Sequence, residues 1–366
     1  MKIKKVWEFL IFFVPLCFPW VTWASEWHCM TVDSAGSGEY GIALALDSRG
    51  YPHIVYRKPY FGTMYASWDG SKWCVGALSD SLGNLTYKKN GLTHYALIID
   101  NQDYPHIVAY GQHIWKDESG WHKTRCDGYD DPSIVFDNND YLHISSSSIC
   151  NAVKYTYQNE EGWHSEYVDA LSVCSGSSIG LNGNCIPYIA YCAAHTPSQS
   201  GLFLATRDTL LGWLFEFIDS IRCYAPSMEL DSLYYPHIAY GYSCLKYATK
   251  SGESWHIETV DTLDWVGEVS LALAKTNCPY ISYRDKSCLL KCAWWDGMWH
   301  VEKVDSMCTS EGPSLISSTT SIAVDKEGYA HIAYRHQFSW EKISLRYATN
   351  RPLSAKAQIY FLKEKR

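Results

Sequence analysis

A tryptophan recurs seven times along this chain, and each one opens a short segment with the residue pattern of a β-strand. Most of these segments reach an aspartate six residues later, as in WHIETVD at 255–261 and WHVEKVD at 299–305. The seven are Trp27, Trp73, Trp121, Trp163, Trp213, Trp255 and Trp299. A second series interleaves with them, an apolar segment such as PHIVY or PYIAY anchored at His53, His106, His143, Tyr188, His237, Tyr280 and His331. Two series with one count and a period of about 40–50 residues predict an all-β fold, a seven-bladed β-propeller.

Residues 226–261 serve as the reference unit of this repeat. They divide into four short segments of alternating polarity, SMEL, HIAY, LKYAT and WHIETV, which predict strands a to d of one antiparallel blade. The a–b turn carries Asp231, and aspartate recurs there at 47, 100, 137 and 325, with Asn182 and Ala274 in the fourth and sixth units. Asp and Asn hydrogen-bond to their own backbone two residues on, which favours a turn.

The two ends of the repeat region predict how the ring closes. The last unit has no Trp-led strand after Asn350, whereas 27–33 is a strand d with no strands a to c before it. Pairing of 27–33 with 345–349 would complete the seventh blade and cover its edge. The propeller is therefore expected over 25–350, and 351–366 is expected to be a basic C-terminal tail.

Residues 1–24 have the pattern of a signal peptide. Three lysines precede the apolar run 9–21, and Thr22 and Ala24 are suitable for cleavage by a signal peptidase. The sequence thus predicts a secreted, periplasmic or cell-surface protein with no transmembrane segment after cleavage. Without residues 1–24, which contain three lysines and one glutamate, the formal net charge changes from −8 to −10. That charge disfavours nucleic acid as a partner.

Fourteen cysteines agree with an oxidising location. Linkers between blades and b–c loops share one face of a propeller, and on that basis four disulfides are predicted: Cys126–Cys150, Cys174–Cys192, Cys223–Cys244 and Cys288–Cys308. No C-x-x-C pair has zinc-ribbon spacing. Neither a metal site nor another cofactor is expected. The recurring histidines are interpreted as structural, because equivalent positions in different blades lie too far apart for one metal ion. The tryptophans are interpreted as packing between blades.

Residues that break the seven-fold pattern are the candidate ligand site. Four positions after the strand-b anchor, blades one, six and seven carry arginine where the other blades do not: Arg57, Arg284 and Arg335. Tyr60, Trp265 and Trp340 fall in loops of the same face and sector. Guanidinium groups bind carboxylates and aromatic rings stack on sugars, so these six residues predict a site for an acidic or sulfated glycan. The alternative is three solvated arginines on an acidic surface.

The units DSRGYPHIVYR (47–57) and WDGSKW (68–73) resemble the repeats of secreted bacterial propellers. The closed, Trp-rich plan of seven blades over 26–350 is similar to that of fucose-binding and related lectin propellers. A second resemblance is to sialidases, whose c–d turns carry a Ser-x-Asp-x-Gly-x-Thr-Trp box. SWDGSKW (67–73) and WWDGMW (294–299) are similar to that box but are one residue shorter and lack the threonine.

These observations favour a non-catalytic binding module whose partner is a glycan or an extracellular protein. One alternative is a sialidase-like glycoside hydrolase, which would need an activated tyrosine or carboxylate nucleophile and a separate acid beyond the arginines. Another alternative is a purely structural propeller. The sequence identifies no catalytic residue.

Overall fold

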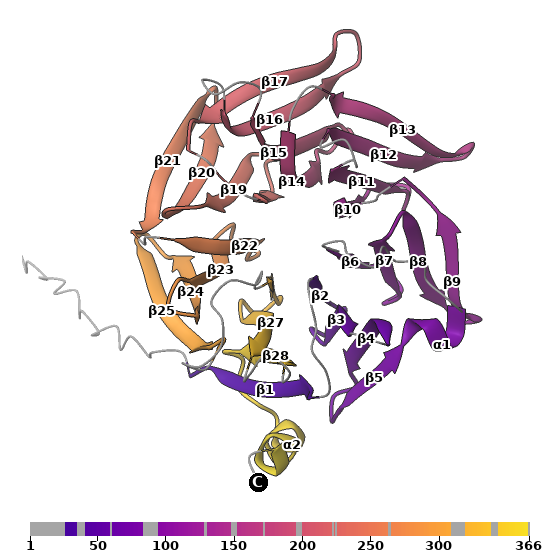
Figure 1. Cartoon of the computed structure of the whole chain (residues 1–366), viewed down its shortest axis with the longest axis vertical. Coiled ribbons are helices and arrows are strands. Elements are labelled where there is room, and N and C mark those ends of the chain that lie inside the picture. Colours follow the sequence, from indigo (N-terminus) through magenta and orange to yellow (C-terminus); the bar gives the residue numbers. More distant parts are fainter. Residues whose placement is uncertain are drawn as a thin grey trace, which may run out of the picture.

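The computed structural model describes residues 26–364 except 35–40, 59–60, 83–93, 128–129, 148–151, 171–172, 195–199, 222, 224, 263–264, 309–318 and 338–342. The predicted signal peptide, Tyr60, Cys150 and Trp340 lie outside the described residues. In the described part, seven four-stranded antiparallel sheets are arranged around one axis (Figure 1). The predicted seven-bladed β-propeller is confirmed.

Each blade runs from an inner strand a at the axis to an outer strand d at the rim. Blades 1 to 3 contain β2 (Ile42–Leu46), β3 (Pro52–Lys58), β4 (Gly62–Trp68), β5 (Trp73–Ala77); β6 (Ala96–Ile99), β7 (Pro105–Ala109), β8 (Gln112–Asp117), β9 (Gly120–Arg125); β10 (Asp130–Phe136), β11 (Leu142–Ser147), β12 (Val153–Asn159), β13 (Gly162–Asp169). Blades 4 to 6 contain β14 (Val173–Leu181), β15 (Pro187–Ala194), β16 (Ser200–Asp208), β17 (Gly212–Asp219); β18 (Ser227–Leu230), β19 (Pro236–Gly241), β20 (Leu245–Ser251), β21 (Ser254–Asp261); β22 (Val266–Leu273), β23 (Pro279–Asp285), β24 (Leu289–Trp295), β25 (Trp299–Ser306). Blade 7 contains β26 (Thr320–Val324), β27 (Ala330–Gln337), β28 (Ile343–Thr349) and β1 (His28–Asp33). Two helices are described, α1 (Leu78–Leu82) and α2 (Ala355–Glu364). Neither is long and apolar enough to cross a membrane.

The ring closes as the sequence predicts. The first strand β1 pairs antiparallel with β28 near the end of the chain, with His28 opposite Thr349 and Asp33 opposite Leu345 (Figure 1). The N-terminal strand therefore covers the outer edge of the seventh blade, which would otherwise present unpaired backbone groups.

The aspartate that ends the Trp-led strand joins neighbouring blades. Its carboxylate accepts a hydrogen bond from a tyrosine hydroxyl on strand b of the next blade. Five such pairs occur among the described residues: Tyr56–Asp33, Tyr191–Asp169, Tyr240–Asp219, Tyr283–Asp261 and Tyr334–Asp305. A basic residue of that same next blade adds an ion pair, such as Lys246 to Asp219 at 2.7 Å. The aspartate recurs six residues after the tryptophan because its carboxylate bonds to the next blade.

The recurring histidines and tryptophans are structural, as interpreted. His331 on strand b lies between the carboxylate of Asp325 in its own a–b turn, 3.1 Å away, and the hydroxyl of Tyr347 on strand c. Five tryptophans of the series pack edge-on against a strand c ring of the preceding blade, for example Trp121 against Tyr65 at 5.0 Å and Trp299 against Tyr247 at 5.1 Å.

A belt of serines connects the inner strands around the axis. The hydroxyl oxygen of each serine accepts a hydrogen bond from a backbone N–H of strand a in the next blade. The five serines are Ser133, Ser178, Ser227, Ser270 and Ser321. These bonds satisfy backbone donors on strands that have no neighbour on their axial side.

Two disulfides are present in the described residues, Cys192–Cys223 and Cys288–Cys308. The second confirms a prediction. The first shows that Cys174–Cys192 and Cys223–Cys244 were wrong, and Cys244 carries a free thiol. In both bridges the b–c end of a blade bonds to the linker that leaves that blade, whereas three of the four predicted pairs used the linker that enters it. The side chain of Cys192 points toward blade 5, where it packs with Cys223 and Met228. The Cys126–Cys150 pair stays a prediction, because Cys150 is outside the described residues.

Candidate functional site

The a–b and c–d turns share one face of the ring, and on this face a cavity of about 510 Å³ lies between blades 4 and 5. It is lined by the a–b turns of both blades and by strands b, c and d of blade 4. We call it the 4/5 cleft. Sequence reasoning did not single out this site.

Tyr234 at the rim of the 4/5 cleft has an unusual backbone conformation. The equivalent residue in each of the seven a–b turns has a positive φ; these residues are Gly50, Asp103, Asp140, Cys185, Tyr234, Asn277 and Gly328. Tyr234 is the bulkiest of them, with φ at 65°. Left-handed backbone costs about 1–2 kcal/mol for residues other than glycine, and asparagine and aspartate tolerate it best. Strain of this kind concentrates at functional sites.

The Tyr234 ring reaches across the cleft onto the turn of blade 4. A Cβ atom built on Gly183 would lie 2.7 Å from the Tyr234 hydroxyl oxygen, so the absence of a side chain at Gly183 leaves room for that ring. Leu233, Tyr234 and Tyr235 are 71%, 47% and 37% exposed. The cleft therefore has an aromatic and apolar rim that faces solvent.

Polar groups lie inside the same cleft. Glu216 on β17 and Lys250 on β20 form an ion pair of 2.6 Å between the two blades. Tyr188 and Asn182 stand where five other blades have histidine and aspartate, so the buried His–Asp contact of those blades is replaced by neutral groups. These two substitutions were visible in the sequence as breaks in the repeat, which blade 6 shares with Tyr280 and Ala274 at the same positions.

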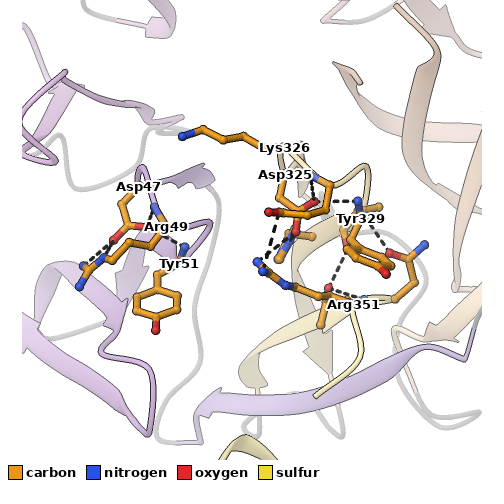
Figure 2. Close-up of polar contacts among 12 residues, drawn as sticks. Asp47, Arg49, Tyr51, Asp325, Lys326, Tyr329 and Arg351 are labelled. Carbon is orange, nitrogen blue, oxygen red and sulfur yellow. Dashed lines mark hydrogen bonds and ion pairs between the residues drawn. The ribbon is translucent and has the colours of Figure 1, made fainter. Parts of the chain in front are cut away.

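A second cavity, of about 240 Å³, lies between blades 7 and 1 on the same face, and we call it the 7/1 cleft. Its walls include Tyr51, Trp68, Trp73 and Tyr347. The chain beyond β28 covers it: Arg351 forms ion pairs with Asp325 at 3.2 Å and with Glu327 at 3.7 Å. Figure 2 shows the Arg351 side chain directed at Asp325, with Tyr51 on the blade 1 side.

The arginines of the sequence-predicted site lie on the opposite face, at the b–c ends of their blades. Arg284 and Arg335 are 5% and 7% exposed, and Arg57 is half-buried. The alternative of three solvated arginines is therefore wrong for Arg284 and Arg335. The structure brings Arg284 and Trp265 together, with the guanidinium carbon 5.4 Å from the centre of the indole ring. An Arg284 Nη also donates to Cys288 Sγ at 3.0 Å.

The axis of the ring is a channel of about 480 Å³ lined by the inner strands of all seven blades. Three titratable groups meet where the channel opens on the face that carries Arg284 and Arg335. His94 Nε2 is 3.2 Å from Asp131 Oδ1 and 3.8 Å from Glu268 Oε1. Burial disfavours the charged form of His94, but the two carboxylates outweigh it and raise its pKa. Burial likewise raises the pKa of Glu268. The mouth of the channel is thus an acidic cluster bridged by one histidine.

Glu229 lies further along the channel wall. Its side chain lines the channel, and the surrounding inner strands shield the carboxyl group from bulk solvent and raise its pKa to about 7. Among the residues that the structure describes, no group of three or more His, Cys, Asp or Glu side chains has a metal-binding arrangement.

Comparison with known proteins shows the fold of the chain and no family. No family model matches it, and no curated protein matches its sequence. Solved propellers do match. Virginiamycin B lyase from Staphylococcus aureus is 11% identical, with a TM-score of 0.57 over 88% of this chain and 99% of that one. SapL1 lectin in complex with alpha methyl fucoside is 13% identical, with a TM-score of 0.51 over 74% and 97%. Aleuria aurantia lectin in complex with Fucalpha1-6GlcNAc is 11% identical, with a TM-score of 0.51 over 82% and 90%. The resemblance to fucose-binding lectin propellers thus holds for the fold.

Proposed function

We propose that this protein is a secreted carbohydrate-binding propeller and that it binds a neutral saccharide in the 4/5 cleft. The observation that carries the proposal is Tyr234, a bulky residue held in left-handed backbone at the rim of an open cleft. A tyrosine in this turn position costs stability, and a contact with a ligand accounts for that cost.

The chemistry of the 4/5 cleft suits a sugar. Tyr234 and Tyr235 offer ring faces for the C–H face of a pyranose, while Glu216, Lys250 and Asn182 offer donors and acceptors for hydroxyl groups. Binding sites for small molecules combine apolar walls with a few polar groups in this way. Because Glu216 and Lys250 neutralise one another, a neutral saccharide fits better than a charged one. Two of the structurally similar propellers are lectins that hold fucosides.

The opposite face is the weaker candidate for an acidic glycan. A ligand there would touch little of Arg284 and Arg335, which are almost fully buried. The carboxylates of Asp131 and Glu268 at the channel mouth would also repel an anion on that face.

Binding is favoured over hydrolysis in the 4/5 cleft. Glycoside hydrolases of the common type place two carboxyl groups about 5–9 Å apart on either side of the scissile bond. Among the described residues that line this cleft, Glu216 carries the one carboxylate, and Lys250 neutralises it. Secretion is supported by the two disulfides, which persist in oxidising compartments.

A glycan array probed with residues 25–366 tests the proposal, followed by calorimetric titration of the best neutral saccharide. We expect Tyr235→Ala to weaken that binding at least tenfold, about 1.4 kcal/mol. Tyr141→Ala is the matched control, because Tyr141 occupies the same turn position in blade 3. Equal affinities for the two variants would contradict the proposal. Binding restricted to acidic glycans and lost in Arg57→Ala would instead favour the opposite face.

A further inference from the structure

The two clefts are built from equivalent positions of the repeat. Strand pairing aligns Tyr188 with His331, since each is the first anchor residue of its strand b and faces a threonine on strand c, Thr206 or Thr349. By the same alignment Tyr235 corresponds to Tyr51, and Lys250 corresponds to Trp68. The 7/1 cleft is therefore the pseudo-symmetric counterpart of the 4/5 cleft, three blades further around the ring.

The walls of the 7/1 cleft are richer in aromatic rings than those of the 4/5 cleft. Trp68 and Trp73 meet edge to face with centroids 5.6 Å apart, and Trp73 meets Tyr347 at 5.3 Å. Trp68 and Tyr51 are only partly buried. Both residues line the cleft, and aromatic rings in the wall of a cleft are surfaces on which a saccharide can stack.

The segment Arg351–Ala357, which we call the C-terminal cover, forms one wall of the 7/1 cleft. Leu353 and Tyr360 pack against the hydrophobic cluster between blades 7 and 1, and the Tyr360 ring meets Trp68 edge-on at 5.4 Å. Arg351 lies against Gly50 of blade 1, where an added Cβ would be 2.8 Å from the guanidinium group. The cover thus touches both sides of the cleft.

The cover is attached much more weakly than a strand. It adds no backbone pairing to either blade, and Pro352, Ser354 and Lys356 are exposed. The carboxylate of Asp325 that Arg351 meets is fully buried, but the Arg351 side chain is 35% exposed. The second ion pair, with the exposed Glu327, is of the kind that contributes about 0–1 kcal/mol. Terminal segments held by few contacts open at low free-energy cost while the remainder stays folded.

We propose that the 7/1 cleft is a second saccharide site and that the C-terminal cover blocks it until the cover is displaced. The inference rests on the proposed function, because the ligand class is taken from the 4/5 cleft. The ligand is a neutral saccharide that stacks on Trp68 and Tyr51. Displacement of the cover would change the number of sugars bound per chain from one to two.

The test is the stoichiometry of saccharide binding, measured by calorimetry for the full chain and for a chain that ends at Asn350. The inference predicts one site per full chain and two per shortened chain, with Trp68→Ala in the shortened chain returning the number to one. In a shortened chain with Tyr235→Ala, the remaining site should be the one that Trp68→Ala removes. A folded shortened chain with the same number of sites as the full chain would overturn the inference, and so would two sites in the full chain.

The full-length variant Arg351→Ala with Tyr360→Ala serves if the shortened chain does not fold. It keeps every strand and removes two of the side chains that hold the cover, so calorimetry should count two sites in this variant. A result of no site in the full chain and one Trp68-dependent site in the variant would refute the 4/5 cleft while supporting the cover. One Tyr235-dependent site in both chains would support saccharide binding in the 4/5 cleft and refute the role of the cover.

Discussion

The hydroxyl of Tyr240 in blade 5 donates a 2.9 Å hydrogen bond to Asp219, the last residue of the outer strand of blade 4. Lys246 of blade 5 completes the contact with an ion pair to the same carboxylate. The tyrosine–aspartate hydrogen bond recurs at five of the blade boundaries in the described part of the chain, and there it joins an outer strand to strand b of the next blade. Neighbouring blades are therefore coupled by polar contacts as well as by apolar packing.

Removal of one such hydrogen bond should destabilise the whole ring. We expect Tyr240→Phe to lower the free energy of unfolding by about 1.5–3 kcal/mol, the range for a hydrogen bond to a charged group. Tyr167→Phe is the control, because Tyr167 is exposed on an outer strand. Urea unfolding followed by circular dichroism measures both. Equal midpoints for the two variants would show that the inter-blade bond contributes nothing.

Deletion of residues 25–34 should lower the melting temperature of the entire protein instead of fraying one end. The deletion removes β1 and exposes the edge of β28, and it also removes Asp33, the partner of Tyr56 and Lys58. Scanning calorimetry should show one transition at a lower temperature. A deletion variant that melts like the intact chain would contradict the role of β1 in closing the ring.

Stability should fall as the pH drops below about 6.5, the ordinary pKa of an unfolded histidine. Burial lowers the pKa of the five strand b histidines, His53, His106, His143, His237 and His331. The unfolded chain then binds more protons than the fold, so their contribution is complete above pH 6.5 and is lost as the pH falls through the folded pKa values. His94 has the opposite sign, because carboxylates raise its pKa and its contribution is lost as the pH rises.

Each strand b histidine can contribute a slope of up to about 1.4 kcal/mol per pH unit below 6.5. Urea unfolding at pH 7.5 and at pH 5.5 measures the summed effect of these histidines on the free energy of unfolding. His237→Tyr should flatten the dependence, since tyrosine fills this position in blades 4 and 6. Identical unfolding free energies at the two pH values would refute the burial of neutral histidines.

Tyr234→Asn should stabilise the protein and weaken its saccharide binding. Asparagine tolerates left-handed backbone, so a gain of about 1 kcal/mol in the free energy of unfolding is expected. Asp140→Asn at the same turn position of blade 3 should leave both properties unchanged. A Tyr234→Asn variant that binds normally would show that the strained tyrosine has no role in recognition.

The sequence predicted the blades because their determinants are periodic. Trp and Asp recur at fixed spacing since both contact the adjacent blade, and the unpaired strands at the two ends left one way to close the ring. The Cys192–Cys223 bridge was missed because the spacing of residues along a strand does not tell which neighbouring blade a side chain faces.

The candidate site was less accessible to sequence reasoning. The search for breaks in the repeat found the arginines but could not show that Arg284 and Arg335 are buried. Tyr188 and Asn182 were noted as exceptions and interpreted as structural. Alignment of the seven a–b turns would also have shown Tyr234 where Gly, Asp and Asn predominate. Its significance follows only from the positive φ of that position, which is a property of the backbone.

The central claim is that the 4/5 cleft holds a saccharide, and a crystal structure of residues 25–366 with the best ligand of the glycan array tests it most directly. The account predicts sugar density between Tyr234 and Lys250, with a ring stacked on Tyr234 or Tyr235. Density on the opposite face beside Arg57, with the 4/5 cleft holding solvent alone, would contradict it.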